Sequence, residues 1–493
     1  MLGGLIGQLT HGRAVIWTGD SFGFLEAGLR LAAGQDPATH LEGRNIGYTL
    51  LSAWLLPLGG LRALVTAQSV AAAASLVAIL LLLREVLRNR WVFCIAGLAM
   101  VLMAYASDSF VVYAQTLNAD SLFGSFLSIS LVLFCLAWRR DGAARLGCMI
   151  GSLALGYAAF LMKPNAMFVL PLGAAALAWM AWRARRAILE PRVLAALAAL
   201  VVAVVLGQTW QARWKNPDVY FGPGMLYAAH MNVTDRDLDL SKPAERDLHQ
   251  ALQAAMHGPK WAVLGFDSDL CYYDDRCQAA IRAAAKADGA DAGSWMMRRL
   301  IAAIIHHPAT YTLKVVRQTA FFFGHPNLEV DLVYPGAISD WDWTRIAPYD
   351  RLVRFHRAEL NRQVGSWMVA RHPVLSFVGK HLVGAMRRSL PFSVVIAAAA
   401  VAAGVRRRRF DGLEVTILSA TLYLLACVLS VAISFTFDIP RYAASFAVLT
   451  YLWWGFCWLW LVRWARRLVR VHPDAAGVDI DIRWGASRGA PRV

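Results

Sequence analysis

The chain has 493 residues, of which 58% are hydrophobic and 17% are charged. Soluble domains average about 45–50% apolar residues, so this composition argues against a soluble enzyme and favours a membrane protein. The formal charge is +16, but the basic residues lie in short clusters between apolar runs and not in one basic domain. This distribution argues against nucleic-acid binding and is typical of loops between membrane spans.

Repeated apolar runs approach the ~20 residues that a helix needs to cross a bilayer. We therefore predict an all-α polytopic membrane protein with about nine transmembrane helices, amphipathic juxtamembrane helices and one mostly helical extracytoplasmic domain. The predicted spans are 62–83, 91–107, 120–138, 146–162, 165–182, 193–210, 389–405, 413–433 and 445–462.

If successive spans cross the membrane in alternating directions, every basic cluster lies on the same side. The positive-inside rule identifies this side as the cytoplasm. The clusters lie at 84–90, 139–145, 183–186, 406–409 and 463–467. The predicted organisation is a first extracytoplasmic loop with juxtamembrane helices (1–61), a transmembrane core (62–210), an extracytoplasmic domain (211–388), C-terminal transmembrane helices (389–462) and a cytoplasmic tail (463–493). Within 211–388 we expect helices over 248–256, 278–287, 295–306 and 309–322, with a break at Pro308.

Nine spans with a cytoplasmic C-terminus place the N-terminus outside, although nothing precedes residue 1 to carry it there. We therefore expect that an additional first helix is missing from this sequence. The apolar stretch Ile46–Gly60 is too short to span comfortably, so we predict an interfacial or re-entrant segment. The tail from Val471 is polar and is expected to be loose.

Two cysteines, Cys271 and Cys277, lie in the longest polar region and predict a local disulfide if that region is outside the cytoplasm. No metal site is predicted. The run from Asp235 to Asp239 begins like a calcium loop, but Leu240 stands where glycine is needed and Arg246 where the bidentate glutamate should be.

Asp20 is the leading catalytic candidate. It precedes the short amphipathic stretch 22–33, where a carboxylate at the membrane surface could remove the proton of an acceptor hydroxyl. An equally simple interpretation is an N-cap. Glu26, four residues before Arg30, is interpreted as a solvated i,i+4 ion pair.

Five further polar residues lie on the predicted outer side of the membrane: Arg44, Asp120, Lys163, Arg441 and Tyr442. The cations could bind phosphate, and the tyrosine could stack on a sugar. The alternatives are headgroup-level anchors for Arg44, Arg441 and Tyr442, a helix cap for Asp120 and a snorkelling side chain for Lys163.

Taken in order, these motifs resemble the GT-C class of integral membrane glycosyltransferases, and most closely the protein O-mannosyltransferase and lipid A aminoarabinose transferase group. The matching segments are 19–34, 44–51, 117–123, 161–166 and 439–442. Members of this class often carry two adjacent acids in the first outer loop, whereas this chain has Ser21 after Asp20. That departure weakens any expectation of a metal ion, and a divalent metal has no support from the residues.

The resemblance implies a polyprenyl-phosphate sugar as donor and Asp20 as the base or acceptor-orienting carboxylate. A hydroxyl of a lipid, glycan or protein would attack with inversion, and Arg44, Lys163 or Arg441 would stabilise the departing phosphate. The implied location is the bacterial inner membrane, with the active site facing the periplasm and membrane lipids as further partners.

Two alternatives remain open. An O-antigen ligase or polymerase-type enzyme would use a diphosphate-linked donor, with Arg298, Arg299, His306 and His307 as its basic residues. A transporter is third, because the sequence shows no paired broken helices and its acids lie at one membrane edge.

Overall fold

The structure is a computed structural model. It describes residues 15–18, 21–38, 45–87, 89–183, 190–214, 237–256, 275–324, 338–355, 357, 373–434, 442, 444–474 and 477–482. These residues are almost entirely helical, apart from one β-hairpin near the C-terminus.

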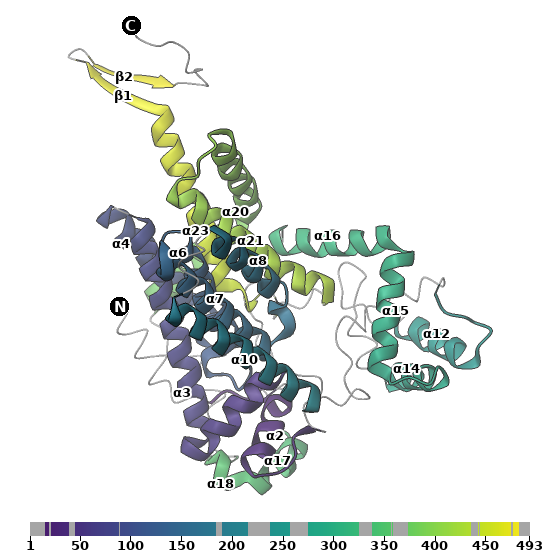
Figure 1. Cartoon of the computed structure of the whole chain (residues 1–493). Coiled ribbons are helices and arrows are strands. Elements are labelled where there is room, and N and C mark those ends of the chain that lie inside the picture. The colour runs from purple at the N-terminus through teal and green to yellow at the C-terminus, as the bar shows by residue number, and fades with distance from the viewer. Residues whose placement is uncertain are drawn as a thin grey trace.

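A bundle of apolar helices forms the body of the protein (Figure 1). Among the described residues, seven helices are long and apolar enough to cross a bilayer. They are α3 (Ile46–Val86); α6 (Asp120–Ala137); α7 (Gly142–Met162); the segment Pro164–Trp182, which combines the short η3 (Pro164–Ala166) with α8 (Val169–Arg183); α10 (Pro191–Trp214); α20 (Pro373–Arg406); and α21 (Gly412–Ser434). The shorter apolar helix α4 (Arg90–Ala106) and the tryptophan-rich α23 (Ala447–Leu468) pack with them. Each predicted span therefore falls on a helix, and the protein is a multi-pass α-helical membrane protein.

Arginines gather at one end of the bundle. Arg139, just after α6, donates to the carbonyl oxygen of Glu85 at 2.8 Å and to that of Gly412 at 3.2 Å. On α23, Arg463 lies 3.6 Å from Asp411. We call this the arginine-rich end; its described members are Arg84, Arg139, Arg140, Arg406–Arg409, Arg463 and Arg466. The start of α6 and the end of α7 lie at the opposite end.

Helix α3 is kinked near its beginning. Gly59 and Gly60 have non-helical backbone angles, and Gly60 lies at φ 64° and ψ −153°. A short helical segment, 46–58, therefore meets the membrane-crossing part at an angle. This is the stretch predicted to be interfacial or re-entrant, and in the structure it is a helix joined to the next span. Arg354 donates to the carbonyl oxygen of Pro57 at 2.8 Å, which satisfies an acceptor that the kink leaves open.

Replacing Gly60 by Ala is expected to destabilise this kink. The backbone region that Gly60 adopts is essentially restricted to glycine and costs other residues about 1–3 kcal/mol. An added Cβ would also lie 2.5 Å from the carbonyl oxygen of Val353. The free energy of unfolding in detergent should fall by at least that amount. Gly147→Ala in α7, where a Cβ meets open space, is the control and should raise it slightly, because alanine favours a helix more than glycine does. Equal stability of the two variants would contradict the argument.

Within the described part of the predicted extracytoplasmic domain, a group of four helices lies beside the bundle: α12 (Pro243–Met256), α14 (Asp275–Ala287), α15 (Ala292–His306) and α16 (Pro308–Gly324). They cover the four stretches predicted as helical, with the break at Pro308. In Figure 1, α16 runs from the bundle to α15, beyond which α12 and α14 lie. Lys314 of α16 is buried and donates to the carbonyl oxygens of Ala432 and Ile433 at the end of α21, which attaches α16 to the bundle.

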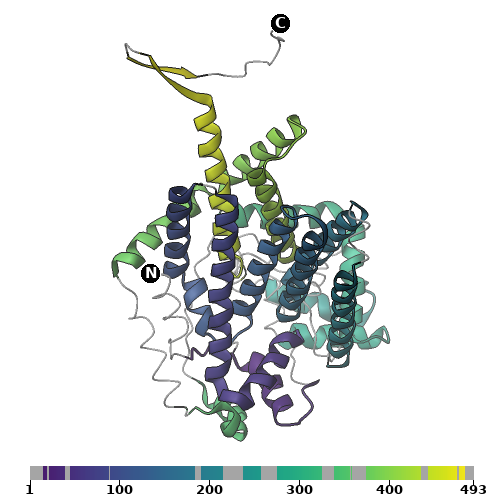
Figure 2. The ribbon, with the colours of Figure 1, turned by 60° about the vertical axis from the view of Figure 1, so that its left-hand side comes forward.

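A second group of short helices packs at the kink of α3. The elements are α2 (Ser21–Ala32), α17 (Asp340–Ile346), η4 (Ala347–Tyr349) and α18 (Asp350–Val353). Figure 2 shows α2 beside α17 and α18 below the long helix α3. The rings of Phe22 and Trp341 lie 5.5 Å apart, edge to face, and fix α2 on α17.

Two boundaries differ from the sequence prediction. Helix α20 begins at Pro373, well before the predicted span start at 389, because Pro373 is well suited to a first helical turn and the following residues continue the helix. The tail expected to be loose forms an antiparallel hairpin of β1 (Val469–Asp474) and β2 (Gly477–Ile482). Apolar and polar residues alternate in both segments, as strands require.

Candidate functional site

Asp120 lies in the first turn of α6 and is 1% exposed. Its backbone N–H donates to the Asn118 side chain at 3.1 Å. The loop before it is held by a short parallel pairing with the N-terminal segment: Ile16 N–H donates to the Gln115 carbonyl at 2.9 Å, and Leu117 N–H donates to the Ile16 carbonyl at 3.0 Å. Residues 15–18 therefore run alongside the loop that leads into Asp120.

Gln68 anchors the same loop from within α3. Its amide donates to the Thr116 carbonyl at 2.7 Å and accepts from the Tyr48 hydroxyl at 3.0 Å. A buried glutamine inside an apolar helix must satisfy its amide, and here it does so by holding a loop. The position of Asp120 is thus set by α3 as well as by its own helix.

Lys163 is the ion-pair partner of Asp120. It follows α7 in an extended conformation, because Pro164 comes next and a residue before proline avoids helical geometry. The residue is 6% exposed, and its Nζ lies 6.0 Å from the centre of the Tyr442 ring. Ser445 Oγ donates to the same carboxylate oxygen of Asp120 at 2.7 Å. Three predicted site residues, Asp120, Lys163 and Tyr442, therefore lie together.

Among the residues that the structure describes, the second carboxylate oxygen of Asp120 has no hydrogen-bond partner, and neither does the buried Tyr113 hydroxyl. Burial first, and the Asp120 carboxylate second, raise the pKa of Tyr113 well above its ordinary value, so the hydroxyl stays protonated. Both residues line a cavity of about 20 Å³, together with Ser75, Ser121 and Ser445. This volume is enough for one water molecule, and its polar lining suits a small hydroxylic group.

The start of α3 meets the end of α7 beside this site. Asn45 donates to the carbonyl oxygen of Phe160 and accepts from Gln211 of α10 at 2.7 Å. The Ile46 N–H donates to the same Gln211 side chain at 2.9 Å. At Gly47 a Cβ would lie 2.7 Å from the backbone of Leu161, so only glycine allows this close approach.

Asp20, Arg44, Arg441 and Cys271 lie outside the described residues, and their roles remain predictions. Cys277 is disulfide-bonded, whereas Cys94, Cys135, Cys148, Cys427 and Cys457 are free. Sequence reasoning missed Tyr113 and Ser445. Their positions in the sequence could have indicated them, because both lie close to predicted site residues. Ser445 stands three residues after Tyr442, and Tyr113 lies in the short outer loop before Asp120.

The interpretation of Glu26 as a solvated ion pair is wrong. Glu26 is 2% exposed and forms an ion pair with Arg345 of α17 in addition to the pair with Arg30, where the atoms are 3.3 Å apart. The Arg345 guanidinium lies 4.1 Å from the centre of the Phe22 ring and 4.2 Å from that of Trp341. Glu26 thus faces another helix, which a pattern within α2 could not reveal.

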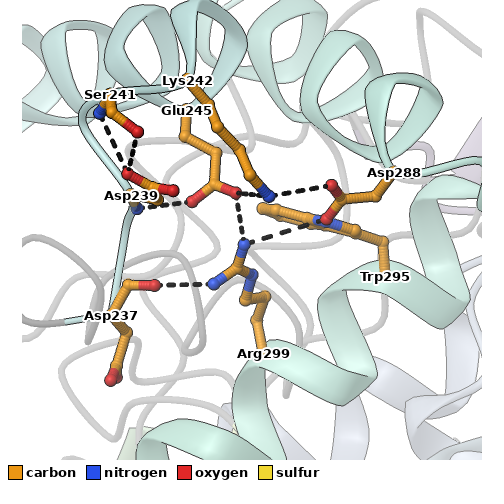
Figure 3. A network of polar contacts seen from close by, with 8 residues as sticks. All are labelled: Asp237, Asp239, Ser241, Lys242, Glu245, Asp288, Trp295 and Arg299. Atoms are coloured by element: carbon orange, nitrogen blue, oxygen red, sulfur yellow. Dashed lines mark hydrogen bonds and ion pairs between the residues drawn. The ribbon is translucent and has the colours of Figure 1, made fainter.

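Three of the four basic residues of the rival ligase interpretation, Arg299, His306 and His307, have contacts in the outer helices, whereas Arg298 is exposed. Figure 3 shows Arg299 at the centre of a network that joins α12, α14 and α15. It donates to the Asp237 carbonyl at 2.6 Å and to Glu245 at 2.7 Å, and it lies over the Trp295 ring. His306 is 2.8 Å from the Asp237 carboxylate. Among the described residues, no cluster of His, Cys, Asp or Glu could hold a metal ion.

Replacing Arg299 by Ala should loosen these three helices. The Glu245 side chain is 3% exposed, and removing one partner of a buried ion pair costs about 3–5 kcal/mol. Lys242 lies 3.3 Å from Glu245 and remains as a partner, so the expected loss of stability is at the lower end of this range. Hydrogen exchange on the full-length protein should accelerate over residues 243–306 and stay unchanged in α6. Arg298→Ala, at an exposed neighbouring position, is the control. Equal exchange in both variants would show that Arg299 does not hold the helices together.

No protein-family model matches the chain, and no curated protein does. Among solved structures, the chain is similar to the crystal structure of ArnT from Cupriavidus metallidurans bound to undecaprenyl phosphate. The similarity covers 91% of this chain and 76% of that chain, with 13% sequence identity and a TM-score of 0.33. At these values the two overall folds superpose only loosely.

Proposed function

We propose that the protein is an inverting glycosyltransferase that moves a sugar from a polyprenyl-phosphate donor to an acceptor hydroxyl at the periplasmic face of the inner membrane. The proposal rests on one observation: the segments of the sequence that resemble the family lie together in the structure. Segment 161–166 contacts 117–123 through the Lys163–Asp120 ion pair and 439–442 through the Tyr442 ring. It also contacts 44–51 through the backbone at Gly47.

The first segment, 19–34, joins the same assembly. The Phe24 ring lies 5.6 Å from that of Tyr48, edge to face, which places α2 on the start of α3. All five segments thus meet at the end opposite the arginine-rich end. Since positive clusters mark the cytoplasmic side, this geometry supports a site on the periplasmic side.

Each side chain has a distinct role in the proposed mechanism. The Asp20 carboxylate takes the proton of the acceptor hydroxyl as the hydroxyl oxygen attacks C1 of the sugar. The bond between C1 and the phosphate oxygen breaks, and the configuration at C1 inverts, as in inverting glycosidases with another hydroxyl in place of water. The phosphate leaves with the electron pair of that bond.

Lys163 would stabilise the leaving phosphate. An ammonium group has three N–H donors, and its contact with Asp120 uses one of them. Asp120, itself held by Ser445, orients the ammonium group in a partly dry site, where a positive charge is most effective. Arg44 and Arg441 would add further positive charge, and Tyr442 would stack on the sugar.

The proposal is tested with the purified full-length protein in proteoliposomes. A labelled polyprenyl-monophosphate sugar and the matching diphosphate-linked sugar are supplied in parallel, with envelope lipids and glycans as acceptors. We expect label transfer from the monophosphate donor only, with inversion at C1. Mass spectrometry of envelope lipids and glycans from cells with and without the gene identifies the acceptor. Transfer from the diphosphate donor alone would favour the ligase interpretation, and no transfer from either donor would contradict the proposal.

A further inference from the structure

An apolar groove opens between α4 and α23, away from the candidate site. Its volume is about 340 Å³, within the range of ligand pockets. The lining includes Ile95 and Met100 of α4 and Tyr451, Gly455 and Trp458 of α23. These side chains belong to the membrane bundle, so hydrocarbon is the expected content of the groove.

The groove continues into a basic chamber at the arginine-rich end. The chamber has a volume of about 590 Å³ and shares Val92, Leu459, Val462 and Arg466 with the groove. An apolar slot that leads into a charged chamber is complementary to an amphiphile with a hydrocarbon chain and a charged head.

The charged residues of the chamber favour a negatively charged head group. Arg139, Arg463 and Arg466 line it together with one acid, Asp411, so three cations face one carboxylate and the balance is +2. The Arg139 guanidinium is occupied by two backbone carbonyls, and Arg463 lies 3.6 Å from Asp411. Among the residues that the structure describes, none forms an ion pair with Arg466, which lies where the groove meets the chamber.

We propose that this groove and chamber form a binding site for an anionic membrane phospholipid. One acyl chain lies in the groove between α4 and α23, and the phosphate lies beside Arg466 and Arg463. Basic pockets between transmembrane helices are suited to anionic headgroups, because the protein supplies charge at the depth where the phosphates lie. This inference does not depend on the proposed glycosyltransferase activity, since the site is at the other end of the bundle.

The test uses delipidated full-length protein in detergent, titrated with phosphatidylglycerol or phosphatidylcholine, with bound lipid counted by native mass spectrometry. We expect phosphatidylglycerol to bind at least five-fold more tightly than phosphatidylcholine. Arg466→Gln should weaken phosphatidylglycerol binding about five-fold, the effect of one basic residue near an anionic headgroup. Arg409→Gln, an exposed arginine at the same end, should not.

A second variant tests the groove itself. A Cβ at Gly455 meets nothing within 4 Å, so Gly455→Leu fills the groove without a clash and improves helix propensity. It should reduce bound phospholipid, whereas Gly147→Leu, at an equally open position in α7, should not. Equal binding of both phospholipids, equal effects of the two arginine variants, or no effect of Gly455→Leu would overturn the proposal. So would selective retention of a polyprenyl phosphate in place of phosphatidylglycerol.

Discussion

Replacement of Asp20 by Asn is expected to lower the rate of sugar transfer by about 10²–10⁴-fold, the usual contribution of a general base. Asparagine has nearly the same shape but cannot accept the acceptor proton. Of the described residues on either side, residues 15–18 run alongside the loop before Asp120, and Ser21 begins α2. The measurement is initial transfer rate in proteoliposomes with the monophosphate donor.

Asp36→Asn is the matched control for this experiment. Asp36 is an exposed acid after α2, and its carboxylate accepts only a local hydrogen bond from Ala38 N–H at 3.0 Å among the contacts seen in the described chain. Its replacement should leave transfer unchanged. If Asp20→Asn keeps nearly full activity while thermal unfolding shows it to be folded, Asp20 is an N-cap and not the base.

Replacement of Lys163 by Met should affect both stability and activity. Asp120 is 1% exposed, and leaving its charge without a partner costs about 3–5 kcal/mol. The free energy of unfolding, measured by SDS titration in mixed micelles, should fall by about that amount. Lys380→Met, which removes an exposed lysine of α20, should not lower it.

A double variant separates the two roles of Lys163. Adding Asp120→Asn removes the unpaired charge and retains an oxygen that can accept from Ser445, so most of the lost stability should return. Transfer activity should remain low, because no ammonium group is left at this position to stabilise the leaving phosphate. Recovery of both stability and activity in the double variant would assign Lys163 a structural role only.

Sequence patterns predicted most of the helices of this protein, but not the hairpin of β1 and β2 or the early start of α20. Apolar runs of nearly bilayer length became helices because a chain in lipid must satisfy its backbone hydrogen bonds internally. The clustering of arginines at one end followed from the same alternation of spans. Even Pro308 ended one outer helix and began another, since its ring suits a first helical turn and breaks a continuing one.

Tertiary structure decided which residues meet. Asp120 begins α6 and Lys163 follows the end of α7, and Tyr442 and Ser445 come from much later in the chain, so neither periodicity nor local spacing could join them. The same limit explains Glu26, whose buried partner Arg345 is far away in sequence. Propensity and hydropathy act over a few turns of helix and therefore determine the elements. Ion pairs between segments that are distant in the sequence depend on how the helices pack, because packing determines which side chains lie close together.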